Sequence, residues 1–197
     1  MRVRRVLLTF LLLGSIAATP TTRPALPRDL EFTDLAGSVH RPLAADAKAV
    51  VLLFVGRECP VSNGYAPEIS RLANEFGPRG VSFYVVYAGA DVNHDSAAKH
   101  AKEYAFTCPA VLDVKCALAN SVGVTRTLEA AVILPDGSLA YRGRIDDQYI
   151  TFGKKRFAPT KRDLREALET IVAGKRVEPR VTDVVGCMIV MPEIKKP

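Results

Sequence analysis

The most constraining feature of the sequence is a change of apolar pattern between residues 55 and 60. Residues 50–55 read Val-Val-Leu-Leu-Phe-Val, a continuous apolar run. Such a run is typical of a strand buried on both faces, as in a parallel sheet covered by helices. From Pro60 to Phe76 the apolar residues recur at three- and four-residue spacing, which predicts a helix. The pattern therefore predicts a strand–turn–helix unit, with a kink in the helix at Pro67.

The rest of the chain alternates between the same two patterns. Further strands are expected at 81–87, 110–112, 130–134 and 139–142, and further helices at 97–105, 116–122 and 160–173. Asp95 and Thr160 are expected to cap the first and last of these helices, and Gly174 to follow the final turn. The main order, β-α-β-α-β-β-α, predicts an α/β domain with a central mixed sheet flanked by helices.

The N-terminus has the pattern of an export signal. Arg2, Arg4 and Arg5 precede a short apolar run that ends at Ala18, whereas a spanning helix needs about 20 apolar residues. We therefore expect an exported, periplasmic protein, with a retained membrane anchor as the alternative. The expected organisation is a signal peptide or anchor at 1–18, a flexible leader at 19–29, the domain at 30–176, and a tail carrying Cys187 at 177–197.

Charge and histidine content argue against two classes of function. The formal net charge is +6, and the three N-terminal arginines supply half of it. The remaining basic residues alternate with acidic ones, as at 161–166, which is typical of a solvated helix face and not of a nucleic-acid site. The three histidines, His40, His94 and His100, show no ligand spacing, so we expect no metal site and no cofactor.

Cys59 is the strongest candidate for a reactive group. It follows the buried strand and precedes Pro60, which suits the first position of a helix. Unpaired amides at a helix start favour a thiolate, and the Ser62 hydroxyl could donate a further hydrogen bond to the sulfur. We therefore predict that the pKa of Cys59 lies below that of a free thiol. Inert packing of the sulfur is the alternative.

The stretch 54–63, Phe-Val-Gly-Arg-Glu-Cys-Pro-Val-Ser-Asn, resembles the active-site strand and helix of thioredoxins. More closely, the chain is similar to bacterial redoxin-domain proteins of the peroxiredoxin/thioredoxin-like superfamily. The similarity rests on this CPVSN-type turn with a single cysteine, on Tyr-Arg-Gly-Arg-Ile-Asp-Asp at 141–147, and on Val-Gly-Cys at 185–187. It covers roughly residues 30–189. It implies a thioredoxin-like fold and thiol–disulfide exchange, with Pro60, Thr127 and Leu128 in contact with substrate.

The chain departs from the thioredoxin pattern at four positions. Ser62 stands where the second active-site cysteine would be, Glu58 replaces a tryptophan, and Leu53 replaces a buried acid. Thr127-Leu128 replaces a threonine followed by a cis-proline. A cis peptide at Leu128 would cost about 2.5–4 kcal/mol, so we expect a trans bond and a less well formed substrate groove.

Because Ser62 cannot form a disulfide, turnover needs another thiol. Cys187 is the candidate internal resolving thiol, and its alternative role is packing within an apolar tail. Cys108 and Cys116 are expected to pack in the interior. Four charged residues after the last hairpin strand are expected to form ion pairs, or alternatively to border the cysteine: Arg142, Arg144, Asp146 and Asp147.

The leading functional hypothesis is an exported thiol–disulfide oxidoreductase that acts on protein disulfides and is recharged by a thiol reductant. The alternative is a redox-inert module that binds proteins through the groove. A thiol peroxidase is a weaker alternative, because Leu52 and Gly56 stand where peroxiredoxins place a proline and a hydroxyl residue.

Overall fold

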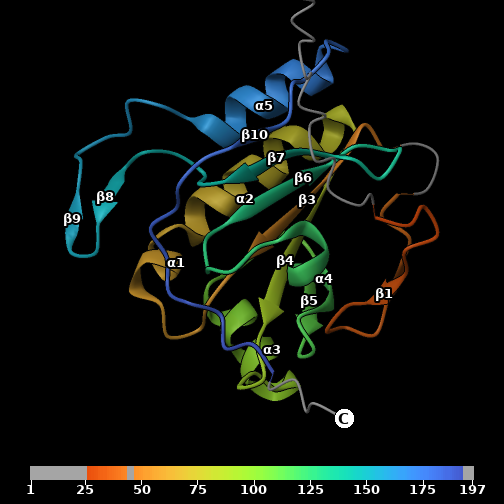
Figure 1. The fold of residues 1–197 in the computed structure, drawn as a ribbon. Coiled ribbons are helices and arrows are strands. Elements are labelled where there is room, and N and C mark those ends of the chain that lie inside the picture. Colours follow the sequence, from red (N-terminus) through yellow and green to blue (C-terminus); the bar gives the residue numbers. More distant parts are fainter. Residues whose placement is uncertain (1–25, 44–46, 193–197) are drawn as a thin grey trace, which may run out of the picture.

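The computed structural model describes residues 26–43 and 47–192 and contains a six-stranded mixed sheet between helices (Figure 1). The strand order is β10-β7-β6-β3-β4-β5. β3, β4 and β5 are parallel, β6 and β7 continue the sheet antiparallel, and β10 pairs parallel to β7. The predicted fold class is therefore confirmed. The strands are β3 (Ala49–Phe54), β4 (Val81–Ala88), β5 (Ala110–Asp113), β6 (Ala130–Ile133), β7 (Leu139–Gly143) and β10 (Arg180–Val181).

Helices pack on the two faces of this sheet, and two small hairpins lie outside it (Figure 1). The helices are α1 (Pro60–Gly64), α2 (Ala66–Phe76), α3 (His94–Glu103), α4 (Ala117–Val122) and α5 (Asp163–Val172), with a 3-10 turn at Gly77–Arg79. The hairpins are β1 (Phe32–Thr33) with β2 (Val39–His40), and β8 (Tyr149–Thr151) with β9 (Lys154–Lys155).

The buried strand β3 divides the interior into two cores. Val51 and Leu53 point to the face covered by α2 and α5, whereas Leu52 and Phe54 point to the face covered by α4. Every residue of β3 is buried, because the strand lies in the middle of the sheet and is covered on both sides. This rigid strand ends directly before the turn that carries Cys59.

The helix expected at 60–76 is broken in two, not merely kinked. α1 ends at Gly64 and α2 begins at Ala66, with Tyr65 between them. Pro67 has no N–H to donate to the carbonyl of Asn63, and its ring would collide with that carbonyl in a continuous helix. The Tyr65 N–H donates instead to the Ser62 carbonyl at 3.0 Å. The Cys59 turn therefore opens a separate short helix.

Two predicted helix caps are wrong, and one is confirmed. Asn93, not Asp95, caps α3, because its side chain accepts the Ser96 N–H. α5 begins one residue after Arg162, not at a Thr160 cap. The Thr160 hydroxyl and N–H donate to the Asp147 carboxylate, at 2.5 and 2.7 Å. Gly174 follows α5 with a φ of +69°, as expected for a helix end.

The expected signal and most of the leader lie outside the described residues. At the end of the leader, Leu26 is buried and its N–H donates to the Gly137 carbonyl, so this position belongs to the fold. Among the described residues, no helix combines the length and the apolar character that crossing a membrane requires. At the other end, the tail joins the sheet through β10 and then runs past α1 toward α3 (Figure 1).

Candidate active site

Cys59 lies in a tight turn between β3 and α1. Its N–H donates to the Gly56 carbonyl at 3.3 Å, and its carbonyl accepts the Asn63 N–H at 2.9 Å. Pro60 is the first residue of α1, as predicted, and it is exposed. The Cys59 residue is only 2% exposed, but it lines a cavity of about 260 Å³. A small reactant can therefore approach it through that cavity.

The tail brings Cys187 to Cys59. Residues 186–190 run antiparallel to residues 125–127, with Met188 opposite Arg126. The Thr127 N–H donates to the Cys187 carbonyl at 2.8 Å, and the Cys187 N–H donates to the Thr127 hydroxyl oxygen at 3.0 Å. These bonds place Cys187 on the same cavity as Cys59.

The Cys59 sulfur is surrounded by hydrogen-bond donors. Burial raises the pKa of its thiol, but hydrogen bonds from the Cys187 thiol and the Thr127 hydroxyl outweigh this effect. The backbone amides of Ser62 and Cys187 add to them, and the pKa lies below its ordinary value. The direction agrees with the sequence-based prediction. Its causes differ, because only the Ser62 amide belongs to the helix that Cys59 opens.

The pKa of the Cys187 thiol is shifted in the opposite direction. Burial, followed by the hydrogen bond and the charge of Cys59, raises the pKa of its thiol to about 11. The site therefore combines one sulfur that favours the thiolate with a neighbour that holds a proton. All four cysteines are free thiols in the structure.

Ser62 acts differently from the prediction. Its hydroxyl oxygen accepts the Gly56 N–H at 3.1 Å, and Ser62 contacts the sulfur through its backbone amide. The reason is that the turn at Gly56 leaves an N–H pointing back toward α1. A side chain at Gly56 would come within 2.7 Å of the Thr127 methyl and 3.1 Å of the Cys59 Cβ. The close packing of this turn thus requires glycine.

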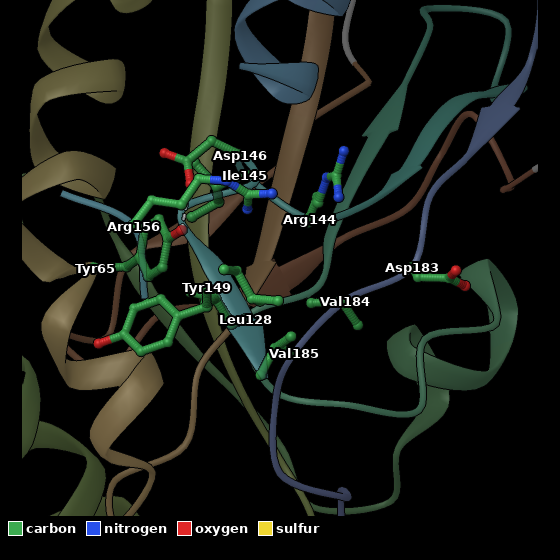
Figure 2. A pocket seen from close by; sticks show the side chains of 11 residues that line it. Tyr65, Leu128, Arg144, Ile145, Asp146, Tyr149, Arg156, Asp183, Val184 and Val185 are labelled. Atoms are coloured by element: carbon green, nitrogen blue, oxygen red, sulfur yellow. Dashed lines mark hydrogen bonds between the residues drawn. The ribbon is translucent and has the colours of Figure 1, made fainter. Parts of the chain in front are cut away.

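Leu128 does not face the Cys59 cavity. No cis peptide bond occurs among the described residues, so the prediction of a trans bond at Leu128 is confirmed. Leu128 adopts a φ of +64°, a left-handed conformation that is unusual for a leucine, while its N–H donates to the Phe54 carbonyl at 2.5 Å. This conformation directs the side chain into a neighbouring cavity of about 200 Å³ (Figure 2). Thr127 alone of the pair lines the Cys59 cavity.

Four charged residues at the end of β7 and directly after it form ion pairs and hydrogen bonds. Arg142 pairs with Glu129 at 3.4 Å and Arg144 pairs with Asp163 at 2.7 Å, whereas Asp147 holds Thr160. Ion pairs were expected for all four, but Asp146 accepts a hydrogen bond from the Tyr65 hydroxyl instead (Figure 2). Burial raises the pKa of both Tyr65 and Asp146. Of the four charged residues, Arg144 and Asp146 line the second cavity, and none lines the Cys59 cavity.

A buried polar chain supports the reactive turn and was missed in the sequence. The Asn63 amide donates to the Arg57 carbonyl at 3.0 Å, and its oxygen accepts from His100 Nε2 at 3.0 Å. His100 Nδ1 accepts from the Tyr87 hydroxyl at 2.7 Å. Burial lowers the pKa of His100, so the ring is neutral near pH 7 and can make both bonds. The asparagine four residues after Cys59 was the available signal.

The other two cysteines and the histidines form no reactive centre. Burial raises the pKa of Cys108 to about 11 and also raises that of Cys116. Cys116 is fully buried and Cys108 packs against the core, which agrees with the packing role expected for both. Within 26–43 and 47–192, no three His, Cys, Asp or Glu side chains are grouped as a metal site requires.

The chain is similar to known proteins both in sequence and in fold. A model described as the AhpC/TSA family matches residues 27–143, which includes Cys59 and Thr127 but not Cys187. No curated protein matches the chain. Among solved structures, the hypothetical protein SMc02350 from Sinorhizobium meliloti is 20% identical, with a TM-score of 0.73. That match covers 89% of this chain and 97% of the other.

Two other solved structures belong to proteins that are named for a redox activity. A secreted Mycobacterium tuberculosis disulfide oxidoreductase homologous to E. coli DsbE is 18% identical, with a TM-score of 0.50, over 74% of this chain and 96% of its own. Peroxidoxin BcpB from the same organism is 23% identical, with a TM-score of 0.55, over 79% and 98%. At these identities the likeness concerns the fold alone, which is thioredoxin-like, as predicted.

Proposed function

The chain belongs to the AhpC/TSA family, and from this premise we propose that it is a thiol–disulfide oxidoreductase. Cys59 is the attacking thiol and Cys187 the resolving thiol. One observation carries the proposal: the main-chain bonds between the tail and Thr127 place Cys187 on the same cavity as Cys59, and the pKa values of the two thiols shift in opposite directions. The thiolate is the nucleophile in disulfide exchange, so this asymmetry assigns the order of attack.

The first step forms a mixed disulfide between Cys59 and the partner. The Cys59 thiolate attacks one sulfur of a partner disulfide, the partner's S–S bond breaks, and its other sulfur leaves as a thiolate that takes up a proton. The donors around Cys59 stabilise the thiolate before the attack. They also keep it a weaker base, so its advantage lies in being ionised near neutral pH.

The second step uses the change of charge at Cys59. In the mixed disulfide Cys59 is no longer an anion, so two of the causes that raise the pKa of Cys187 disappear. The Cys187 thiolate then attacks the Cys59 sulfur and releases the partner's second thiol. The two electrons have passed to the partner, and a thiol reductant reduces the Cys59–Cys187 disulfide to restart the cycle.

Location and partners are part of the same proposal. The basic segment and the short apolar run that ends at Ala18 support export to the periplasm, with retention at the membrane as the alternative. A secreted disulfide oxidoreductase among the fold neighbours is consistent with it. The partners are protein disulfides and a thiol reductant.

A pH titration of alkylation tests the reactive thiol. The reduced chain is treated with iodoacetamide and the modification of Cys59 is followed by peptide mass spectrometry. We expect an apparent pKa below that of free cysteine, about 8.5. A value at or above it would favour the redox-inert binding module.

Turnover assays then separate the roles of the thiols. Cys59→Ser should abolish reduction of a protein disulfide, and Cys187→Ser should stop the reaction at a mixed disulfide on Cys59. Cys108→Ser is the matched control and should reduce the substrate at the wild-type rate. Unchanged turnover of Cys187→Ser would remove its resolving role.

The peroxidase remains the second candidate, because one fold neighbour is named a peroxidoxin. Gly56 offers no hydroxyl beside Cys59, although the Thr127 hydroxyl does reach the sulfur. We expect peroxide consumption to be slow relative to disulfide reduction. Faster consumption of peroxide than of disulfide would reverse the order of the two candidates.

A further inference from the structure

Tail residues 186–190 occupy a groove beside Cys59 as an added strand. Besides the bonds at Thr127, the Ile189 N–H donates to the Thr125 carbonyl at 3.0 Å, and the Arg126 side chain donates to the Gly186 carbonyl at 3.0 Å. At the far end, the Ala90 N–H donates to the Val190 carbonyl at 3.0 Å. The tail is thus held from residue 186 to residue 190.

The tail contributes its main chain to every one of these bonds. Main-chain bonds of this kind do not depend on the sequence of the strand that is added, so the groove accepts an extended segment in general. Selectivity must come from the positions at which the groove touches side chains. Three tail positions differ sharply in this respect.

The position before the cysteine has no room for a side chain. A Cβ at Gly186 would lie 1.8 Å from the carbonyl oxygen of Thr127, which is fixed in the loop before β6. Two residues after the cysteine, the Ile189 side chain is buried in the core on the α4 face, in a site that we call the socket. Met188 and Val190, by contrast, are 63% and 53% exposed.

We propose that the tail is an internal copy of the partner, and that this groove binds an extended partner segment with the pattern Gly-Cys-x-Ile or Gly-Cys-x-Val. This inference rests on the proposed function and specifies its substrate. The partner's cysteine, in a disulfide, takes the place of Cys187. Its preceding glycine fits against Thr127, and its aliphatic residue fills the socket of Ile189.

Partner and tail cannot occupy the groove together. The partner enters when the tail leaves, and its disulfide is then attacked by Cys59 as described above. When the tail returns it takes the groove from the partner and places the Cys187 sulfur against Cys59. Return of the tail therefore couples resolution of the mixed disulfide to release of the reduced partner.

The test uses the full chain carrying Cys187→Ser, which stops at the mixed disulfide. Peptides of sequence Val-Val-Gly-Cys-Met-Ile-Val are prepared with the cysteine capped by thionitrobenzoate, and the release of the cap reports attack by Cys59. One variant peptide has valine in place of glycine, another has aspartate in place of isoleucine, and a third replaces the methionine by glutamine. Capped free cysteine is the reference reagent.

We expect the parent and glutamine peptides to react about tenfold faster than the valine and aspartate peptides, as the cost of overpacking a tight contact suggests. Adding Gly186→Val to the chain should loosen the tail and raise the rate with the parent peptide several-fold. Equal rates for all four peptides, with normal attack on capped cysteine, would overturn the groove proposal and leave the oxidoreductase intact. Failure of Cys59 to attack even capped cysteine would overturn both.

Discussion

The Cys59 turn and the Cys116 turn share their main-chain hydrogen bonds, although Cys59 has extended and Cys116 left-handed backbone angles, and the pKa values of their thiols shift in opposite directions. Each cysteine directly precedes a short helix, donates its N–H to the carbonyl three residues earlier, and accepts the N–H of an asparagine four residues later. Both residues are buried. Yet the pKa of Cys59 is lowered, whereas that of Cys116 is raised. Position at a helix start is therefore not what makes a thiol acidic.

The two turns differ in which group accepts hydrogen bonds from the first N–H groups of the helix. At the second turn Asp113 accepts the N–H groups of Ala117 and Ala119, at 2.7 and 3.0 Å. Burial raises the pKa of Cys116, and the Asp113 charge raises it further. At the first turn the equivalent residue is Gly56, which has no side chain, and the Ser62 amide reaches the sulfur. A reactive thiol requires donors that no carboxylate has already taken.

The strongest way to break this contrast is to place a carboxylate in the first turn. Gly56→Asp reproduces the spacing of Asp113 and should raise the pKa of Cys59 by about 2 units, because a like charge beside a thiolate disfavours it. Alkylation of Cys59 at pH 7 should then slow about a hundredfold.

Gly56→Ala is the matched control, because it adds the Cβ that crowds Thr127 without adding charge. Equal alkylation rates in the two variants would show that crowding, and not charge, governs the sulfur.

Cys108 sharpens the contrast, because burial of its thiol outweighs the backbone hydrogen bonds from Cys108 and Val85 that lower its pKa. Burial raises its pKa to about 11, so its contribution to stability is complete below the unfolded pKa and is lost as pH rises through 11. Denaturant unfolding of the wild type should lose about 2 kcal/mol more than Cys108→Ala between pH 8.5 and 11.

In the same measurement, Cys59→Ala should change the pH dependence of the free energy of unfolding in the opposite direction. A thiol with a lowered folded pKa stabilises the fold above its unfolded pKa, and that contribution is lost as pH falls through the folded pKa. The same pH profile for both variants would contradict the assigned directions.

Thr127 tests the donors themselves. Thr127→Val keeps the shape of the side chain and removes the hydroxyl that donates to Cys59, so the pKa of Cys59 should rise by about 1 unit and alkylation should slow about tenfold. Thr125→Val is the control, since Thr125 is exposed and binds the tail through its carbonyl. A similar change in both variants would show that the effect does not come from the Thr127 hydroxyl.

The smallest expected effect comes from neutralising Asp113. Asp113→Asn keeps an acceptor for the α4 amides and removes the charge, so the pKa of Cys116 should fall by less than about 1 unit and stay above that of Cys59, since burial remains. NMR of isotope-labelled cysteine Cβ atoms measures both values in one sample. An unchanged pKa of Cys116 would leave burial and the Asp91 charge as the causes of its rise.

Much of the fold follows from local patterns in the sequence. The apolar run at 50–55 predicts the central strand, because only a strand covered on both faces has no polar side. The caps fail for a different reason: Thr160 is a good cap in isolation, but Asp147 from a distant loop binds its hydroxyl and N–H. A local rule cannot anticipate a competing partner that only the folded chain supplies.

The candidate site likewise has features that follow from the local sequence and features that depend on the folded chain. Strand, turn and Pro60 predict the location of Cys59, since all three are neighbours in the chain. The Ser62 hydroxyl was expected to donate to the sulfur, and the structure adds that its oxygen accepts the Gly56 N–H, which becomes available only in the folded turn. That Cys187 lies against Cys59 depends on how the tail crosses the 125–127 loop. No spacing between the two cysteines encodes that crossing.

The place of Cys187 in the chain has a consequence for biosynthesis. It follows every helix of the described fold, so a nascent chain completes the sheet strands β3 to β7 before the residue that pairs with Cys59 is available. Until then the Cys59 sulfur lacks the Cys187 thiol and amide as donors. A core that forms in this order encloses Cys108 and Cys116 before Cys187 is available, which keeps these two thiols from mispairing with it.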